Sequence, residues 1–167
     1  AQGMQFTAVI ESLQDGIGNT LGFLVLILAL GAMLGKQVAN SGAAQQISDS
    51  LFAVFGIKNT QWAVMLTGFI VGITLFYSVG FVILVPLVFT IARSTGLSLM
   101  SIGLPMLAAL SVTHGFLPPH PAPSAIAVLF GADIGLTLLY GLVVAIPAIL
   151  ISGPLLGRYL KKVEAKH

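Results

Sequence analysis

The sequence predicts an all-α membrane protein built from spanning helices, a re-entrant helical hairpin and an interrupted helix. The first observation is composition: of 167 residues, 57% are hydrophobic and only 7% are charged, whereas a soluble domain carries about 25% charged residues. So few charges argue against a soluble enzyme, a nucleic-acid-binding module and a disordered chain. The second and third observations are the spacing of those charges and the glycines and prolines that interrupt the apolar runs.

Two charge-free runs have the length of a single bilayer crossing, which needs about 20 apolar residues. They are residues 16–35 and residues 134–157, and spanning helices are predicted at 20–36 and 134–157. The second contains Pro147, where we expect a bend. In the first run, Gly31 and Gly35 form a small-xxx-small pair. This pair indicates either close helix contact or a chance spacing in a glycine-rich chain.

Residues 41–56 have a different pattern. Apolar side chains recur at helical spacing along one face, and glutamines, serines and Asp49 share the other face. The segment is too polar to span a membrane. It is therefore predicted to be an amphipathic helix in the interface.

The charge-free run 59–92 is too long for one crossing and slightly too short for two. Two shorter helices that meet inside the membrane fit its length, so residues 61–93 are predicted to form a re-entrant hairpin. Its arms are Gln61–Tyr77 and Phe81–Arg93, with a turn at the polar or small residues between them. Non-helical backbone at that depth needs a protein or water-filled surrounding.

The next run, residues 97–131, has the sequence THGFLPPHPAP at its centre. Four prolines remove backbone donors there and cannot continue an ordinary helix. The run is therefore predicted to be one interrupted crossing, in which Leu97–Phe116 and Ser124–Gly131 are helical and Leu117–Pro123 is unwound.

Charge placement supports the hairpin. With residues 61–93 re-entrant, nearly all lysines and arginines lie on one side, which the positive-inside rule makes cytoplasmic. A single crossing would put the basic C-terminal cluster outside. The elements together look like one repeat, which transporters often pair with an inverted copy. The first residues lack an initiator Met and the features of a signal peptide, so we expect the chain to begin within a longer protein.

The hairpin tip is the first candidate site. The N-terminal end of the second arm would direct partial positive charge at the tip, Ser78 can donate and accept hydrogen bonds, and Gly80 lets a ligand approach the backbone. These features suit a carboxylate or a polyhydroxy compound. In a purely structural interpretation, Ser78 caps the second arm and Tyr77 anchors the chain at the interface.

The histidines of the interrupted helix are the second candidate site. Histidine near mid-membrane is uncommon, and its charge changes near neutral pH, so His114 and His120 are candidates for carrying a proton. Alternatively, they bond carbonyls that the unwound stretch leaves free. With no cysteine and no nearby carboxylate, no metal site and no cofactor are predicted. Asp133 is expected to cap the last helix.

No catalytic triad, paired carboxylates, phosphate-binding glycine loop or HExxH motif is present, so the sequence does not predict an enzyme. What remains is a transport protein, a channel or exporter for small solutes, or a non-transporting membrane segment.

Three stretches resemble the gluconate permease family of bacterial inner-membrane transporters: LGAMLGKQVANSGAAQ, QWAVMLTGFIVGITLFYSVGFVILVPLVFTIA and ALSVTHGFLPPHPAPSAIA. The resemblance covers nearly all of the chain, although family members are much longer. It implies uptake of gluconate or a related sugar acid with protons by a multi-pass protein of the bacterial inner membrane. It also implies a fold like the ion-transporter superfamily, of which this chain would hold one repeat, completed by the remainder of the transporter or a second copy.

The family motifs can be matched to positions in this chain. Substrate-binding residues are expected at the hairpin motif and at the proline–histidine motif, and proton coupling at the two histidines. The family's LFYEVGF-like motif carries a glutamate where this chain has Ser78, which leaves proton coupling to the histidines. The substrate-binding candidates are Tyr77, Ser78, Val79, Gly80, Thr113, Pro118 and Pro119, and the proton-coupling candidates are His114 and His120.

Overall fold

The structure, a computed structural model, describes residue 3 and residues 5–164. The described part is helical, with irregular connections. Its helices are α1 (Phe6–Asn40), α2 (Ala43–Phe55), α3 (Thr60–Thr74), α4 (Tyr77–Thr95), α5 (Leu99–Phe116), α6 (Pro121–Leu129), α7 (Ile134–Leu150) and α8 (Leu156–Glu164), with a 3₁₀ turn at Ile57–Asn59 and a π-helical turn at Ile151–Leu155.

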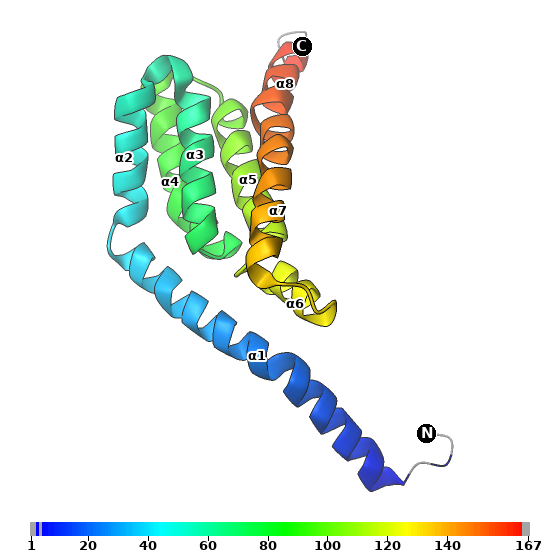
Figure 1. Ribbon diagram of the computed structural model, residues 1–167. Helices are drawn as coiled ribbons and strands as arrows, with labels where there is room; N and C mark the ends of the chain where they lie inside the picture. The colour runs from blue at the N-terminus through cyan, green and yellow to red at the C-terminus, as the bar shows by residue number, and fades with distance from the viewer. Residues whose placement is uncertain (1–2, 4, 165–167) are drawn as a thin grey trace.

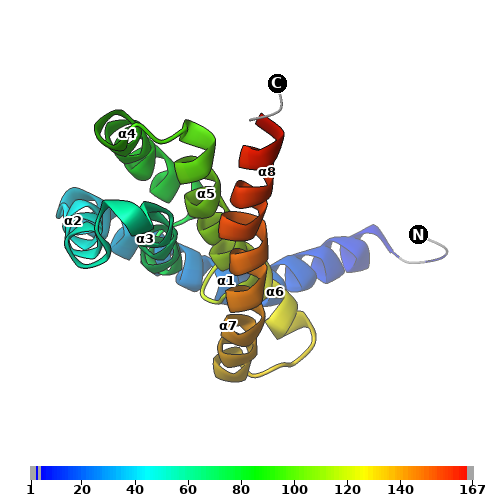
Figure 2. The same ribbon diagram turned by 90° about the horizontal axis from the view of Figure 1, so that it is seen from above.

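The helices α2, α3, α4, α5 and α7–α8 stand side by side and form what we call the bundle (Figure 1). Successive members run in opposite directions: short connections join α2 to α3, α3 to α4 and α4 to α5, and α6 links α5 to α7 (Figure 1). The helices α1 and α6 lie at one end of the bundle, and α1 extends away from it, as the view from above shows (Figure 2). The bundle end near α1 and α6 is called the lower end below.

Among the residues whose side chains are described, three helical stretches are long and apolar enough to cross a membrane: Tyr77–Thr95, Leu99–Leu129 and Ile134–Leu160. Their outward faces carry exposed large apolar side chains, which lipid rather than water would cover. The chain therefore has the architecture of an all-helical membrane protein.

Glycines set a close contact in the bundle, between α3 and α5. A Cβ added to Gly68 would lie 2.9 Å from the backbone oxygen of Met106, and one added to Gly72 would collide with Thr113. Gly68 and Gly72 are therefore a small-xxx-small pair that lets two backbones approach. At Gly31 an added Cβ would meet only the ring of Phe76, at 3.8 Å, so that position makes no comparable helix contact. The surroundings of Gly35 lie outside the described side chains.

Several predicted boundaries differ from those in the structure. The first helix begins at Phe6, well before the predicted start of residues 20–36, because charged residues mark an aqueous end but do not stop a helix. The last helix contains Pro147 without a break and instead widens into the π-helical turn Ile151–Leu155. This turn accommodates Pro154, which has no N–H for an ordinary helical bond.

The amphipathic segment forms α2, within two residues of the predicted 41–56, and buries Ala44 and Ser48 against the bundle. Its position in the membrane interface stays a prediction. The prediction for Asp133 is confirmed: it is the N-cap of α7, and its Oδ1 accepts a hydrogen bond from the amide of Leu136 at 2.8 Å.

Candidate functional site

Two helix breaks lie at the lower end of the bundle. The first is the extended pair Leu75–Phe76 between α3 and α4, and the second is Leu117–His120 between α5 and α6. The predicted turn between Tyr77 and Phe81 is wrong in position, because Tyr77 already begins α4. The break forms where Leu75 is fully buried, so apolar packing holds it, not the polar and flexible residues on which the prediction relied.

The second break is shorter than the predicted Leu117–Pro123. The helix resumes at Pro121, so Pro121 and Pro123 lie in the first turn of α6. Proline is tolerated there because the first N–H groups of a helix have no intrahelical partner. Only Pro118 and Pro119 stand in the unwound part, and they remove its backbone donors.

A histidine of the second break caps the first. Nε2 of His120 lies 2.7 Å from the carbonyl oxygen of Gly72, in the last turn of α3. That carbonyl is one of those left without a partner where a helix ends. His120 is only 2% exposed, so water does not compete for this bond. The two breaks are thus joined by a buried hydrogen bond between residues far apart in the sequence.

The two histidines also contact each other. Nδ1 of His114, in the last turn of α5, lies 3.2 Å from Nδ1 of His120. The aromatic rings of Phe76 and Tyr77 lie beside them, with ring centroids 6.4 Å from that of His114 in both cases. The breaks therefore gather two imidazoles and two aromatic rings at one point.

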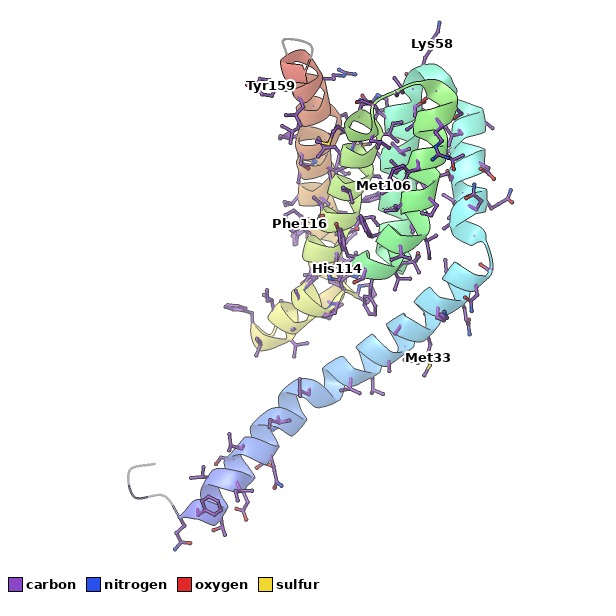
Figure 3. All side chains as sticks on the ribbon, turned by 180° about the vertical axis from the view of Figure 1, so that it is seen from behind. Met33, Lys58, Met106, His114, Phe116 and Tyr159 are labelled. Atoms are coloured by element: carbon purple, nitrogen blue, oxygen red, sulfur yellow. The ribbon has the colours of Figure 1, made fainter. Side chains whose placement is uncertain are left out.

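A cavity of ≈ 590 Å³ opens at this point, within the range of about 300–1,000 Å³ that is usual for ligand sites. It is lined by one face of α1, by the start of α4, by His114 and by the start of α6: Val25, Ala29, Ala32, Phe76, Ser78, His114 and Pro121. Figure 3 shows His114 at the lower end of the bundle, at the opposite end from Lys58. Of these lining side chains, only that of His114 is ionisable.

The N-terminus of α4 borders this cavity through Phe76 and Ser78 and carries free hydrogen-bond donors. The amide of Gly80 bonds to the carbonyl of Phe76 at 2.9 Å, but the amides of Tyr77, Ser78 and Val79 precede the first intrahelical bond. Among the described residues, no side chain caps this helix. Three free amides and the positive end of the helix dipole together form a site that favours an anion.

The second break offers few donors. Between Leu117 and Pro123, only Leu117, His120 and Ala122 have an N–H, and the first two bond to the carbonyls of Thr113 and Leu117 at 3.1 Å. Of these three amides, only that of Ala122 has no such backbone bond. The donors for a carboxylate come from α4 and, when it is protonated, from His114.

The structure places some of the predicted site residues at the cavity and others inside the bundle. Ser78 and His114 line the cavity, and Tyr77 lies beside His114. Gly80 and Thr113 instead lie inside the packing of the bundle: a Cβ on Gly80 would meet Leu110 at 2.9 Å, and the Thr113 hydroxyl donates within its own helix.

Val79 is exposed, Pro118 is buried and Pro119 is exposed, and none of the three is among the residues lining the cavity. Their side chains therefore do not face the space that would hold a ligand. The amide of Val79 remains relevant as one of the three free donors of α4.

Sequence reasoning missed Phe76, Pro121 and the α1 residues of the cavity wall. Phe76 precedes the assumed turn, and its aromatic neighbours become visible only in the fold. Ala29 and Ala32, with Gly31 between them, make this part of the helix narrow, and both alanines line the cavity. That local drop in side-chain size was the available signal, but it does not identify the facing element.

Comparison with known proteins adds the family. The chain is 58% identical over 163 residues to the high-affinity gluconate transporter of Escherichia coli, covering 98% of this chain and 37% of that protein. It is 55% identical over 164 residues to the Gnt-II system L-idonate transporter of Escherichia coli, again 98% of this chain and 37% of the relative. It is 56% identical over 163 residues to the gluconate permease of Bacillus subtilis, covering 98% of this chain and 36% of that protein.

The chain thus spans a little over one third of the length of these relatives. No solved structure matches it. The family model described as "GntP family permease" matches residues 1–167. This family consists of transporters and not of enzymes. With a helical apolar bundle and a match over its whole length, the chain belongs to the GntP family of permeases.

Proposed function

We propose that this chain forms the substrate-binding part of a transporter that takes up gluconate or a related sugar acid with protons across the bacterial inner membrane. Relatives named as gluconate and L-idonate transporters support the substrate class. Both named substrates are sugar acids, with one carboxylate and several hydroxyl groups. The site must therefore accept one negative charge and a polar chain.

The observation that carries this proposal is the cavity where the N-terminus of α4 meets His114. A carboxylate that leaves water loses several hydrogen bonds, so it needs donors already in place. The three free amides of α4 provide them without a fixed positive charge. His114 can add a positive charge when it is protonated, which gives proton coupling a physical basis.

For the fold, we propose that α3 and α4 form the re-entrant hairpin and that α5 and α6 form the interrupted helix of an ion-transporter-like repeat. The 15 residues of α3 extend roughly 22 Å at about 1.5 Å per residue, which is short of the ~30 Å hydrocarbon core. A second, inverted repeat elsewhere in the transporter would complete the site. Movement of the bundle against a scaffold would then give alternating access.

The contribution of the α4 amides can be tested by changing Tyr77→Pro and comparing it with Tyr77→Ala. Phe76 has φ −60° and ψ 145°, which is compatible with a following proline, and proline is accepted at the first helical position. The proline variant loses one amide donor. Since a hydrogen bond to a charged group contributes about 1.5–3 kcal/mol, we expect its KM for gluconate to rise roughly 10- to 100-fold above that of the alanine variant. Equal KM values would contradict an anion site at these amides.

The transport mechanism can be tested by counterflow in proteoliposomes that contain the transporter with this segment. Unlabelled gluconate inside should accelerate entry of labelled gluconate, because a carrier exchanges one substrate for another. L-Idonate inside should do the same, whereas a neutral sugar of the same length should not. Entry that is independent of internal substrate would indicate a channel and would refute the carrier.

A further inference from the structure

We propose that His120 is a positioning residue that fixes the tautomer of His114. The histidine pair then takes up a single proton, which binds at Nε2 of His114. The protonated Nε2 of His114 in turn donates a hydrogen bond to the substrate carboxylate. This inference rests on the proposed function, because it names the atom at which proton and sugar acid meet. It goes beyond that function by assigning different roles to the two histidines and by setting the number of protons.

The first step is the orientation of His120. A carbonyl oxygen can only accept, so the 2.7 Å contact with Gly72 requires that Nε2 of His120 carries a hydrogen. A neutral imidazole has one N–H, which leaves a lone pair on Nδ1 of His120. Burial of the ring, at 2% exposure, keeps water from replacing Gly72 as the partner.

The second step follows from the contact between the rings. Nδ1 of His114 lies 3.2 Å from Nδ1 of His120, and two lone pairs would repel at that distance. Because His120 presents an acceptor there, His114 must donate from Nδ1. Its Nε2 then carries the lone pair and is the nitrogen left for the cavity that His114 lines.

The third step concerns proton uptake. A proton added at Nε2 of His114 turns that atom from an acceptor into a donor and leaves the bond between the rings intact. The bridging hydrogen can lie nearer either ring without changing this result. A second added proton would put two N–H groups opposite each other across 3.2 Å, so the connected pair accommodates one proton only.

Few other titratable or charged groups lie near the histidine pair. From α4, Tyr77 is the titratable neighbour, with its ring 6.4 Å from that of His114. The described α1 residues that face the cavity are Val25, Ala29 and Ala32, and α3 contributes the carbonyl of Gly72. Among these residues none bears a fixed charge, so the protonated pair and the carboxylate would form a loaded site of zero net charge.

Two substitutions of His120 separate its two bonds. Asparagine places an amide oxygen near the position of Nδ1, so His120→Asn keeps the acceptor for His114 and loses the cap on Gly72. Glutamine places an amide nitrogen near Nε2, so His120→Gln keeps the cap and loses the acceptor. The two variants are therefore matched controls for each other, and neither removes the proposed proton-binding atom.

The test is nitrogen-15 NMR of labelled histidine in the chain reconstituted into lipid nanodiscs, with His114 assigned through His114→Gln. We expect the Nδ1–H tautomer at His114 in the original protein and in His120→Asn, and conversion to the Nε2–H tautomer in His120→Gln. An Nε2–H tautomer in the original protein, or no change in His120→Gln, would overturn the proposal. The tautomer does not depend on transport, so failure of the proposed sugar-acid function would not alter this readout.

Proton counting tests the second half of the inference. Simultaneous measurement of gluconate and proton entry into proteoliposomes should give a ratio of one and no net charge movement. In His120→Gln the pH dependence of uptake should shift, whereas in His120→Asn it should be retained. A ratio of two or more, or identical pH profiles in both variants, would refute a single-proton pair ordered by His120.

Discussion

His114→Gln should abolish acid-stimulated gluconate uptake while the transporter remains folded in the membrane. The substitution keeps most of the side-chain volume and its ability to form hydrogen bonds, but it removes the atom that gains a proton. The carboxylate would lose a charge-assisted bond of about 1.5–3 kcal/mol. This corresponds to a loss in apparent affinity of roughly 10- to 100-fold at low pH, since 1.4 kcal/mol is about tenfold.

The measurement is the initial rate of labelled gluconate uptake across a pH series, with transporter content checked by immunoblot. Ser111→Ala is the matched control, because it changes an exposed side chain one turn earlier on the same helix. The control should keep both rate and pH dependence. Uptake by His114→Gln that still rises as the pH falls would exclude this histidine from proton coupling.

Gly72→Ala should strongly lower the stability of the bundle. A Cβ at this position would collide with Oγ1 of Thr113, which is fully buried and bonded to the carbonyls of Ala109 at 2.9 Å and Leu110 at 3.0 Å. Because the hydroxyl is buried and held by these bonds, we expect α3 to shift from α5. Overpacking of this kind costs about 1–3 kcal/mol, and the shift also moves the carbonyl that His120 caps.

We therefore expect a lower thermal unfolding temperature in detergent for Gly72→Ala and a loss of gluconate uptake. Gly115→Ala is the control, because an added Cβ there meets nothing within 4 Å and alanine is favoured over glycine in a helix by up to about 1 kcal/mol. Its unfolding temperature should be unchanged or higher. Similar unfolding temperatures for the two variants would show that the close contact between α3 and α5 does not determine the stability of the protein.

The number and order of the apolar segments follow from the sequence, because charges are rare and separate the apolar runs, although α1 continues through Glu11, Asp15 and Lys36. The position of the first break does not follow from the same pattern. Local reasoning placed a turn at the polar and small residues Ser78 and Gly80, whereas the chain breaks at Leu75–Phe76. Burial of Leu75 and packing of Phe76 against the histidines decide this position, and both are tertiary contacts.

The glycine pairs illustrate the same limit. Gly31 with Gly35 and Gly68 with Gly72 have identical spacing, and spacing alone does not say which pair faces another helix. The structure gives the close contact to the second pair, because Met106, Ala109 and Thr113 of α5 lie against it.

The histidines show which features of the site a local sequence pattern can predict. Their shared segment and six-residue separation are visible in the sequence. The carbonyl that orients His120 belongs to a different helix, 48 residues away, and no local pattern identifies it. The assignment of a tautomer to His114 therefore needed the fold.

The bond from His120 to Gly72 has a consequence for movement. Separating the end of α3 from the start of α6 would leave a buried carbonyl and a buried imidazole N–H without partners, which costs about 1–3 kcal/mol for each group. The tips of the two helix pairs are therefore expected to travel as one rigid block during a transport cycle. Access to the cavity would then change on its opposite wall. The α1 residues described there, Val25, Ala29 and Ala32, are apolar, so they can slide without breaking a polar side-chain bond of their own.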